Sequence, residues 1–126
     1  MDTGKIKNNT TFYDGYEGEP QVFLAIKECE ELNISIWDGY FEDIFGAPNL
    51  DGEGWQGFTK DYNQLEGAFA EDVENVEIAP EAYLTDICAY TEKQFEYEET
   101  AQVVSLIKYF LQYAMENQRT VIVSLR

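Results

Sequence analysis

The sequence contains no histidine, two cysteines and eight basic residues among its 126 positions. Without histidine the chain cannot form a Ser-His-Asp or Cys-His catalytic group, or a histidine metal site. Cys29 and Cys88 lie too far apart for a C-x-x-C or zinc-type motif. Because cysteine is among the most buried residue types, we expect both to be reduced core residues, which would form a disulfide only if the fold brought them together.

Clusters of basic residues and long apolar runs are also missing. The few Lys and Arg are scattered, whereas a nucleic-acid binder needs them clustered against phosphates. No segment approaches the ~20 apolar residues of a membrane span, and residues 1–10 lack the apolar stretch of a secretory signal. The sequence therefore predicts a cytoplasmic protein that binds neither nucleic acid nor membranes.

The residues present in excess are acidic. The 25 Asp and Glu outnumber the basic residues to give a net charge of −17, and no base occurs from residue 28 to residue 59. Such a charge by itself serves solubility. However, 44% hydrophobic and 15% aromatic residues argue against disorder and predict one domain with a substantial core.

The hydrophobic pattern predicts an α+β domain: a small sheet flanked by helices, ending in two amphipathic helices and a C-terminal strand. In the first half we expect strands at 10–13 and 16–17 around an Asp14-Gly15 turn, a helix over 20–32, a strand at 34–37 and a helix at 38–45. Short apolar runs such as 34–37 do not by themselves separate strand from helix. A glycine-rich loop at 47–57, a helix at 59–69 and a strand at 73–78 follow.

The last third has the most regular pattern. It predicts a helix from Pro80 to about residue 95, a second helix over 98–116 and a buried strand at 120–125. The apolar face of the second helix comprises Val103, Val104, Leu106, Ile107, Phe110, Leu111, Ala114 and Met115.

One segment has the beginning of a calcium-binding pattern. Residues 49–54 place Asn49, Asp51 and Glu53 at positions 1, 3 and 5 and glycine at position 6. Position 12, which should be a bidentate Glu, is Lys60, and its charge repels calcium. The segment is therefore interpreted as a glycine-rich turn, and we expect no metal or other cofactor.

Neither the acidic pairs nor the glycines indicate an enzyme. With 25 acids some pair always falls close together, so spacing carries no information about carboxylate catalysis. Gly52, Gly54 and Gly57 do not form a phosphate-binding loop.

The acidic surface instead indicates a basic protein partner. A negative field speeds encounter with a positive cleft, and Tyr and Trp are favoured interface anchors. We expect the contact surface between residues 51 and 74, where Lys60 is the only base. Its candidate residues are Asp51, Glu53, Trp55, Asp61, Tyr62, Glu66, Glu71, Asp72 and Glu74. The competing location on the N-terminal side comprises Tyr16, Asp38 and Glu42.

Four segments resemble a known family. They are YFEDIF at 40–45, FEYEET at 95–100, LIKYFLQYA at 106–114 and VIV at 121–123. They are similar to immunity proteins of bacterial contact-dependent growth inhibition systems, in particular those against ribonuclease toxins. The likeness covers residues 37–125 and its motifs are core and helix positions, so no binding residue is carried over.

The resemblance implies a non-enzymatic cytoplasmic monomer that binds a cognate toxin nuclease one-to-one and blocks its active site. The alternative is an acidic interaction module or nucleic-acid mimic for another basic protein. A third reading is a carboxylate enzyme that the motifs do not disclose.

Overall fold

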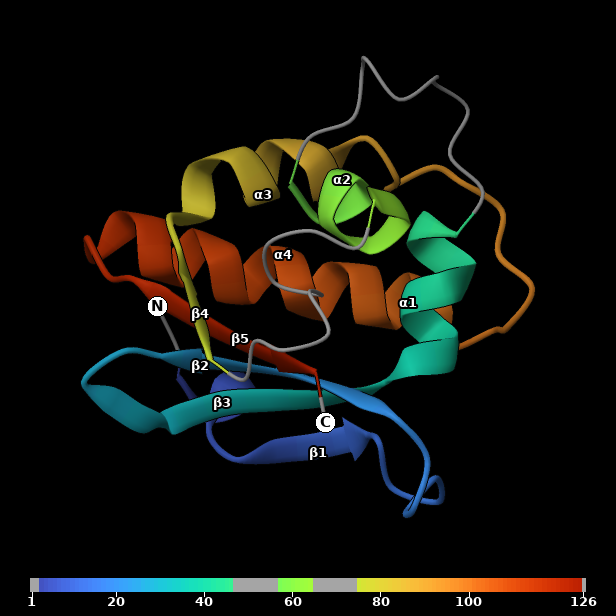
Figure 1. The fold of residues 1–126 in the computed structure, drawn as a ribbon, viewed down its shortest axis with the longest axis horizontal. Coiled ribbons are helices and arrows are strands. Elements are labelled where there is room, and N and C mark those ends of the chain that lie inside the picture. Colours follow the sequence, from blue (N-terminus) through green and yellow to red (C-terminus); the bar gives the residue numbers. More distant parts are fainter. Residues whose placement is uncertain (1–2, 47–56, 65–74, 126) are drawn as a thin grey trace.

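The computed structural model describes residues 3–46, 57–64 and 75–125. In these residues five strands form one mixed sheet, and four α-helices all lie on one side of it (Figure 1). The predicted α+β class and C-terminal strand are confirmed. The elements in chain order are the 3-10 turn η1 (Gly4–Ile6), β1 (Asn9–Phe12), β2 (Gln21–Ile26), β3 (Cys29–Trp37), α1 (Asp38–Phe45), α2 (Gly57–Gln64), β4 (Val76–Ile78), α3 (Pro80–Cys88), α4 (Thr100–Glu116) and β5 (Val121–Leu125).

The sheet has the strand order β1-β3-β2-β5-β4. β1 pairs parallel with β3, and every other pair is antiparallel. The central strand β2 pairs on one side with its hairpin partner β3 and on the other with β5, where Leu24 lies opposite Val123. Long-range pairing therefore joins the first quarter of the described chain to its last strand.

The helix α4 supplies the largest single part of the core. Its buried side chains include Val103, Val104, Ile107, Phe110 and Leu111, while the outward-facing Met115 is 38% exposed. Figure 1 shows α4 lying along the sheet, with α3 packed on its other side. The predicted apolar face is thus confirmed except at Met115, which is exposed although its neighbour Ala114 is fully buried.

The predicted helix over 20–32 is wrong, because these residues form β2, a turn and the start of β3. Val22, Leu24 and Ile26 are spaced by two as well as by four, and all three are fully buried. Pairing on both edges of β2 decides in favour of the strand. Glu28, which ends the two-residue turn, has a φ of 70° in the left-handed region.

The predicted hairpin around Asp14-Gly15 is also wrong in its second half. The strand at 10–13 exists as β1, but residues 13–19 form successive turns, in which Tyr16 N donates to Tyr13 O and Glu19 N to Tyr16 O. Gly15 and Gly18 both have a φ above 90°, which bends the chain away from β1.

Most other boundaries agree, with α3 the clearest exception. The strand at 34–37 lies within β3, the helix at 38–45 is α1, and the predicted elements at 98–116 and 120–125 are α4 and β5. The helix predicted to reach residue 95 ends at Cys88, where Ala89 N and Tyr90 N form tighter turn hydrogen bonds. The predicted helix at 59–69 is seen as α2 up to residue 64, and the predicted strand at 73–78 is seen as β4 from residue 76. Residues 65–74 and residues 47–56 of the predicted loop at 47–57 lie outside the described residues, whereas Gly57 begins α2.

The expectation for the cysteines is only half correct. Both are free thiols, but neither is in the core, since Cys29 is half-buried and Cys88 is exposed. Cys88 is the last residue of α3 and is exposed, whereas its neighbour Ile87 is buried, so the predicted apolar face of this helix is wrong at Cys88.

Candidate functional site

Of the nine residues predicted to contact a partner, only Asp61 and Tyr62 lie within the described residues. Both belong to α2. The other seven, Asp51, Glu53, Trp55, Glu66, Glu71, Asp72 and Glu74, fall outside the described ranges.

Asp61 lies inside the protein rather than on its surface. It is 7% exposed, and the Tyr83 hydroxyl donates a hydrogen bond to its carboxylate. Burial, followed by this hydrogen bond and the charge of Asp61, raises the pKa of Tyr83. In the described fold the carboxylate of Asp61 therefore joins α2 to α3.

A second buried carboxylate fastens the beginning of α2. Asp86 of α3 accepts hydrogen bonds from the backbone N–H of Thr59 at 2.8 Å and from its hydroxyl at 2.7 Å. Burial raises the pKa of Asp86, and the hydrogen bonds from Thr59 oppose that rise. The arrangement is an N-terminal cap supplied by a different helix, since it satisfies donors that a helix leaves unpaired.

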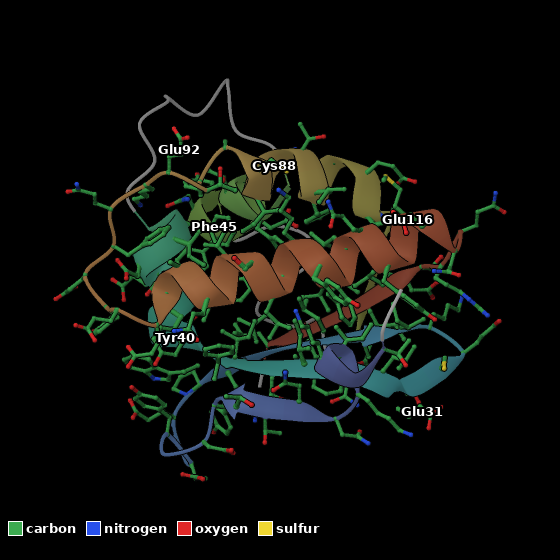
Figure 2. The ribbon with its side chains drawn as sticks, turned by 180° about the vertical axis from the view of Figure 1, so that it is seen from behind. Glu31, Tyr40, Phe45, Cys88, Glu92 and Glu116 are labelled. Carbon is green, nitrogen blue, oxygen red and sulfur yellow. The ribbon has the colours of Figure 1, made fainter. Side chains whose placement is uncertain are left out.

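Four aromatic side chains from distant segments meet at one end of the molecule. We call Tyr16, Trp37, Tyr40 and Tyr97 the aromatic cluster. The Tyr16 ring stacks on Trp37 with 4.0 Å between centroids, and Tyr97 lies edge-on to Trp37 at 5.5 Å and to Tyr40 at 5.8 Å. Figure 2 shows the labelled Tyr40 at the opposite end of the molecule from Glu31 and Glu116. Because Tyr97 is 37% exposed, the cluster presents an aromatic face to solvent.

Carboxylates surround the aromatic cluster. Glu42, Glu96 and Glu99 are exposed, and Asp38 is half-buried in the first turn of α1. Burial raises the pKa of Asp38, the neighbouring Glu42 raises it further, and a hydrogen bond with Tyr62 opposes the rise. Tyr62 is therefore attached to this end of the molecule through Asp38, and the charge of Glu42 acts on it as well, so the two predicted locations meet here.

Asp43 organises the loop that carries Tyr97. Its carboxylate accepts hydrogen bonds from the backbone N–H groups of Glu96 and Tyr97 and from the Thr100 hydroxyl. Burial would raise the pKa of Asp43, but these hydrogen bonds and the charge of Lys93 outweigh it and hold the pKa below its usual value. The carboxylate of Asp43 is thus ionised, and its hydrogen bonds with Glu96, Tyr97 and Thr100 hold this loop in place.

A pocket of about 380 Å³ opens beside Tyr97. In it the Lys93 ammonium donates to the backbone carbonyls of Asp43 and Ile44 at 3.1 and 3.0 Å. The lining residues are Gly39, Glu42, Asp43, Gly46, Lys93, Glu96 and Tyr97. Carboxylates and an exposed phenol beside a pocket are groups that bind Lys or Arg side chains through ion pairs and cation–π contacts.

Ion pairs do not neutralise this face within the described part of the chain. The pairs found there are Lys7–Glu31 at 3.9 Å and Lys27–Glu77 at 2.6 Å, and neither includes a carboxylate near the aromatic cluster. No group of three or more Cys, Asp and Glu side chains among the described residues is arranged to hold a metal ion. No helix of the described structure is long and apolar enough to cross a membrane.

The sequence identified this end of the molecule only in part. Tyr16, Asp38 and Glu42 formed the competing location, whereas Trp37, Asp43, Glu96 and Tyr97 were not singled out. The alternation of acids and aromatics in 37–43 and 95–99 is a local signal that both segments share. Only the fold shows that the two segments are neighbours.

Comparisons with protein-family models, with curated proteins and with solved structures gave no match to this chain.

Proposed function

We propose that this protein is a non-enzymatic inhibitor of a basic protein, and specifically an immunity protein that binds and blocks a cognate toxin nuclease in the cytoplasm, most simply a ribonuclease, as a monomer in a one-to-one complex. The observation that carries the proposal is the aromatic cluster with exposed carboxylates around it. The resemblance of residues 37–125 to immunity proteins supports the toxin-specific form of the proposal.

The chemistry of this surface fits a cleft lined with Lys and Arg. A nuclease keeps such a cleft to bind phosphates, and a net charge of −17 raises the rate of encounter with it. Once the complex forms, the face of Tyr97 and the pocket beside it provide short-range contacts for cationic side chains. Electrostatics therefore governs association, and the aromatic contacts govern dissociation.

Two observations support the proposal that the α1 end, rather than α2, anchors the interface. Asp61 is buried and bonded to Tyr83, so its carboxylate is committed within the protein. By contrast, Glu42 and Glu96 are exposed on the pocket next to Tyr97. The predicted residues outside the described ranges remain candidates for the rest of the contact.

The proposal expects a neighbouring reading frame to encode a basic nuclease, and protection and binding assays with that nuclease test it. We expect the parent protein to rescue growth when the two are co-expressed and to inhibit purified nuclease at a one-to-one ratio. The double variant Glu42→Lys with Glu96→Lys should slow association at least tenfold, and Tyr97→Ala should weaken binding by about 2 kcal/mol. The matched control is Glu31→Lys with Glu116→Lys, which makes the same charge change at the far end of the molecule (Figure 2).

The outcomes separate the candidate functions. If both site variants bind and protect like the parent while folded by circular dichroism, this surface is not the contact. If the parent binds unrelated basic proteins as tightly as the neighbouring nuclease, the protein is a general acidic interaction module or nucleic-acid mimic instead.

A further inference from the structure

Acidic residues are unevenly distributed along this chain. The two longest stretches without Asp or Glu are residues 3–13, with Lys5 and Lys7, and residues 100–115, with Lys108. These stretches are 11 and 16 residues long, in a chain that has 25 acids among 126 residues. They are separated by nearly ninety residues of acid-rich sequence.

The fold places these two stretches side by side. Together they line a groove of about 720 Å³ between η1 and β1 on one side and the outer face of α4 on the other. Figure 2 shows α4 and β1 exposed on the same view of the molecule. The volume lies within the range of about 300–1,000 Å³ that is common for ligand sites.

The groove lining combines apolar side chains with cationic and neutral polar ones. Phe12 and Leu106 supply apolar surface, and Gln102 and Gln112 supply amide groups. The charged lining residues are Lys5 and Lys108, and no carboxylate lines the groove among the described residues. The Lys5 ammonium lies 5.3 Å from the centre of the Tyr109 ring, a cation–π contact that holds it over the groove wall.

The edge of β1 does not present free backbone groups along its whole length. Thr11 N donates to the Asn9 side chain at 2.9 Å, and Thr10 O accepts from both Tyr13 N and Asp14 N. A strand added to this edge would compete with those bonds. An occupant is therefore held by side chains along the groove rather than by strand pairing.

We infer that this groove binds an extended acidic segment of a partner protein, with carboxylates on Lys5 and Lys108 and apolar side chains on Phe12 and Leu106. The inference is independent of the proposed function, which uses the opposite charge at the α1 end. The net charge of −17 does not forbid such binding, because at 0.15 M salt the screening length is about 8 Å. At that range the nearby lysines outweigh distant carboxylates.

The test uses a fluorescein-labelled octapeptide of alternating Glu and Leu at 0.15 M salt, with ¹⁵N-labelled full-length protein for mapping. We expect amide shifts to change at groove residues such as Thr11 and Ser105, and not at the aromatic cluster. Lys5→Gln with Lys108→Gln should weaken peptide binding at least tenfold. Lys7→Gln with Lys27→Gln removes the same charge from lysines outside the groove and should leave binding within twofold.

Four results would overturn the inference. They are the absence of peptide binding at millimolar protein, equal weakening by both double variants, equal binding of a Gln-Leu peptide, and the same shift changes with inorganic phosphate alone. The last would identify a small-anion site rather than a peptide groove. Because both lysine pairs are surface side chains, unchanged melting temperatures confirm that weakened binding does not reflect unfolding.

Discussion

Asp43 and Thr100 are 57 positions apart, yet the Asp43 carboxylate accepts a hydrogen bond of 2.7 Å from the Thr100 hydroxyl. The same carboxylate accepts hydrogen bonds from Glu96 N at 2.9 Å and Tyr97 N at 3.1 Å. A single side chain of α1 therefore orders the loop before α4 and positions Tyr97 within the aromatic cluster.

Replacing Asp43 by Asn should destabilise the fold by about 1–3 kcal/mol, because an amide has one acceptor oxygen for the three donors and carries no charge. Urea denaturation measures the loss. Glu42→Gln is the matched control at the neighbouring position. Because the Glu42 side chain is exposed, this substitution should change the free energy of unfolding by less than about 0.5 kcal/mol. Equal stabilities of the two variants would show that the Asp43 hydrogen bonds contribute nothing net.

The contribution of Asp43 should also depend on pH. Its folded-state pKa is held below the ordinary value of about 3.9, so ionisation stabilises the fold above that pH. The stability is lost as pH falls through the lowered folded pKa. The difference in unfolding free energy between the parent and Asp43→Asn should therefore be constant from pH 5 to 7 and shrink below about pH 4. A difference that grows on acidification would contradict the assigned direction.

Replacing Asp86 by Ala should loosen α2. The change leaves the Thr59 N–H and hydroxyl without their carboxylate partner, at a cost of about 1–3 kcal/mol. Hydrogen exchange at α2 amides should accelerate more than exchange at α4 amides. Glu81→Ala, an exposed change on the same helix, is the control and should leave both rates near those of the parent.

Phe110→Ala should cost roughly 3–5 kcal/mol, because the ring is fully buried between α4 and the sheet. Met115→Ala on the same helix should cost about 0.5 kcal/mol or less, since that side chain is 38% exposed. Denaturant melts of the two variants compare them directly. Similar losses at both positions would mean that the buried face of α4 is assigned incorrectly.

Under the proposed function, association with the nuclease should depend strongly on salt. Raising the salt concentration from ~0.05 to ~0.5 M shortens the screening length and should reduce the association rate by at least tenfold. The dissociation rate should change much less, because short-range aromatic contacts persist. Stopped-flow measurements across a salt series test this, and a flat association rate would exclude electrostatic steering.

The last third of the chain is the part of the fold that the sequence predicted most completely. In α4 the apolar residues repeat at helical spacing along the helix, and the apolar run at 120–125 was predicted as a buried strand and is seen as β5. In β2, by contrast, the positions of Val22, Leu24 and Ile26 fit both the two-residue period of a strand and the four-residue spacing of a helix. The deciding interaction there is pairing with Val123 and its neighbours, which no local pattern contains.

The candidate site was harder to predict for the same reason. Tyr16, Asp38 and Glu42 could be proposed from their local mixture of acid and aromatic residues. The partnership of Trp37 with Tyr97, whose ring centroids are 5.5 Å apart, depends on the loop held by Asp43. Likewise, sequence suggested that Asp61 is a surface acid, because a buried carboxylate cannot be recognised before its partner Tyr83 is known.

The place of β5 in the sheet has a consequence for biosynthesis. β5 lies between β2 and β4, so until residues 121–125 have left the ribosome β2 lacks its second neighbour and β4 lacks the one partner that it has in the described sheet. Nascent chains that hold only β1 to α4 expose an unpaired edge of β2. Completion of the fold, and with it any inhibitory activity, is therefore delayed until after translation of β5, and contacts this distant in sequence make the final step slow. Under the proposed function, a cell would therefore need a reserve of finished molecules before the toxin appeared.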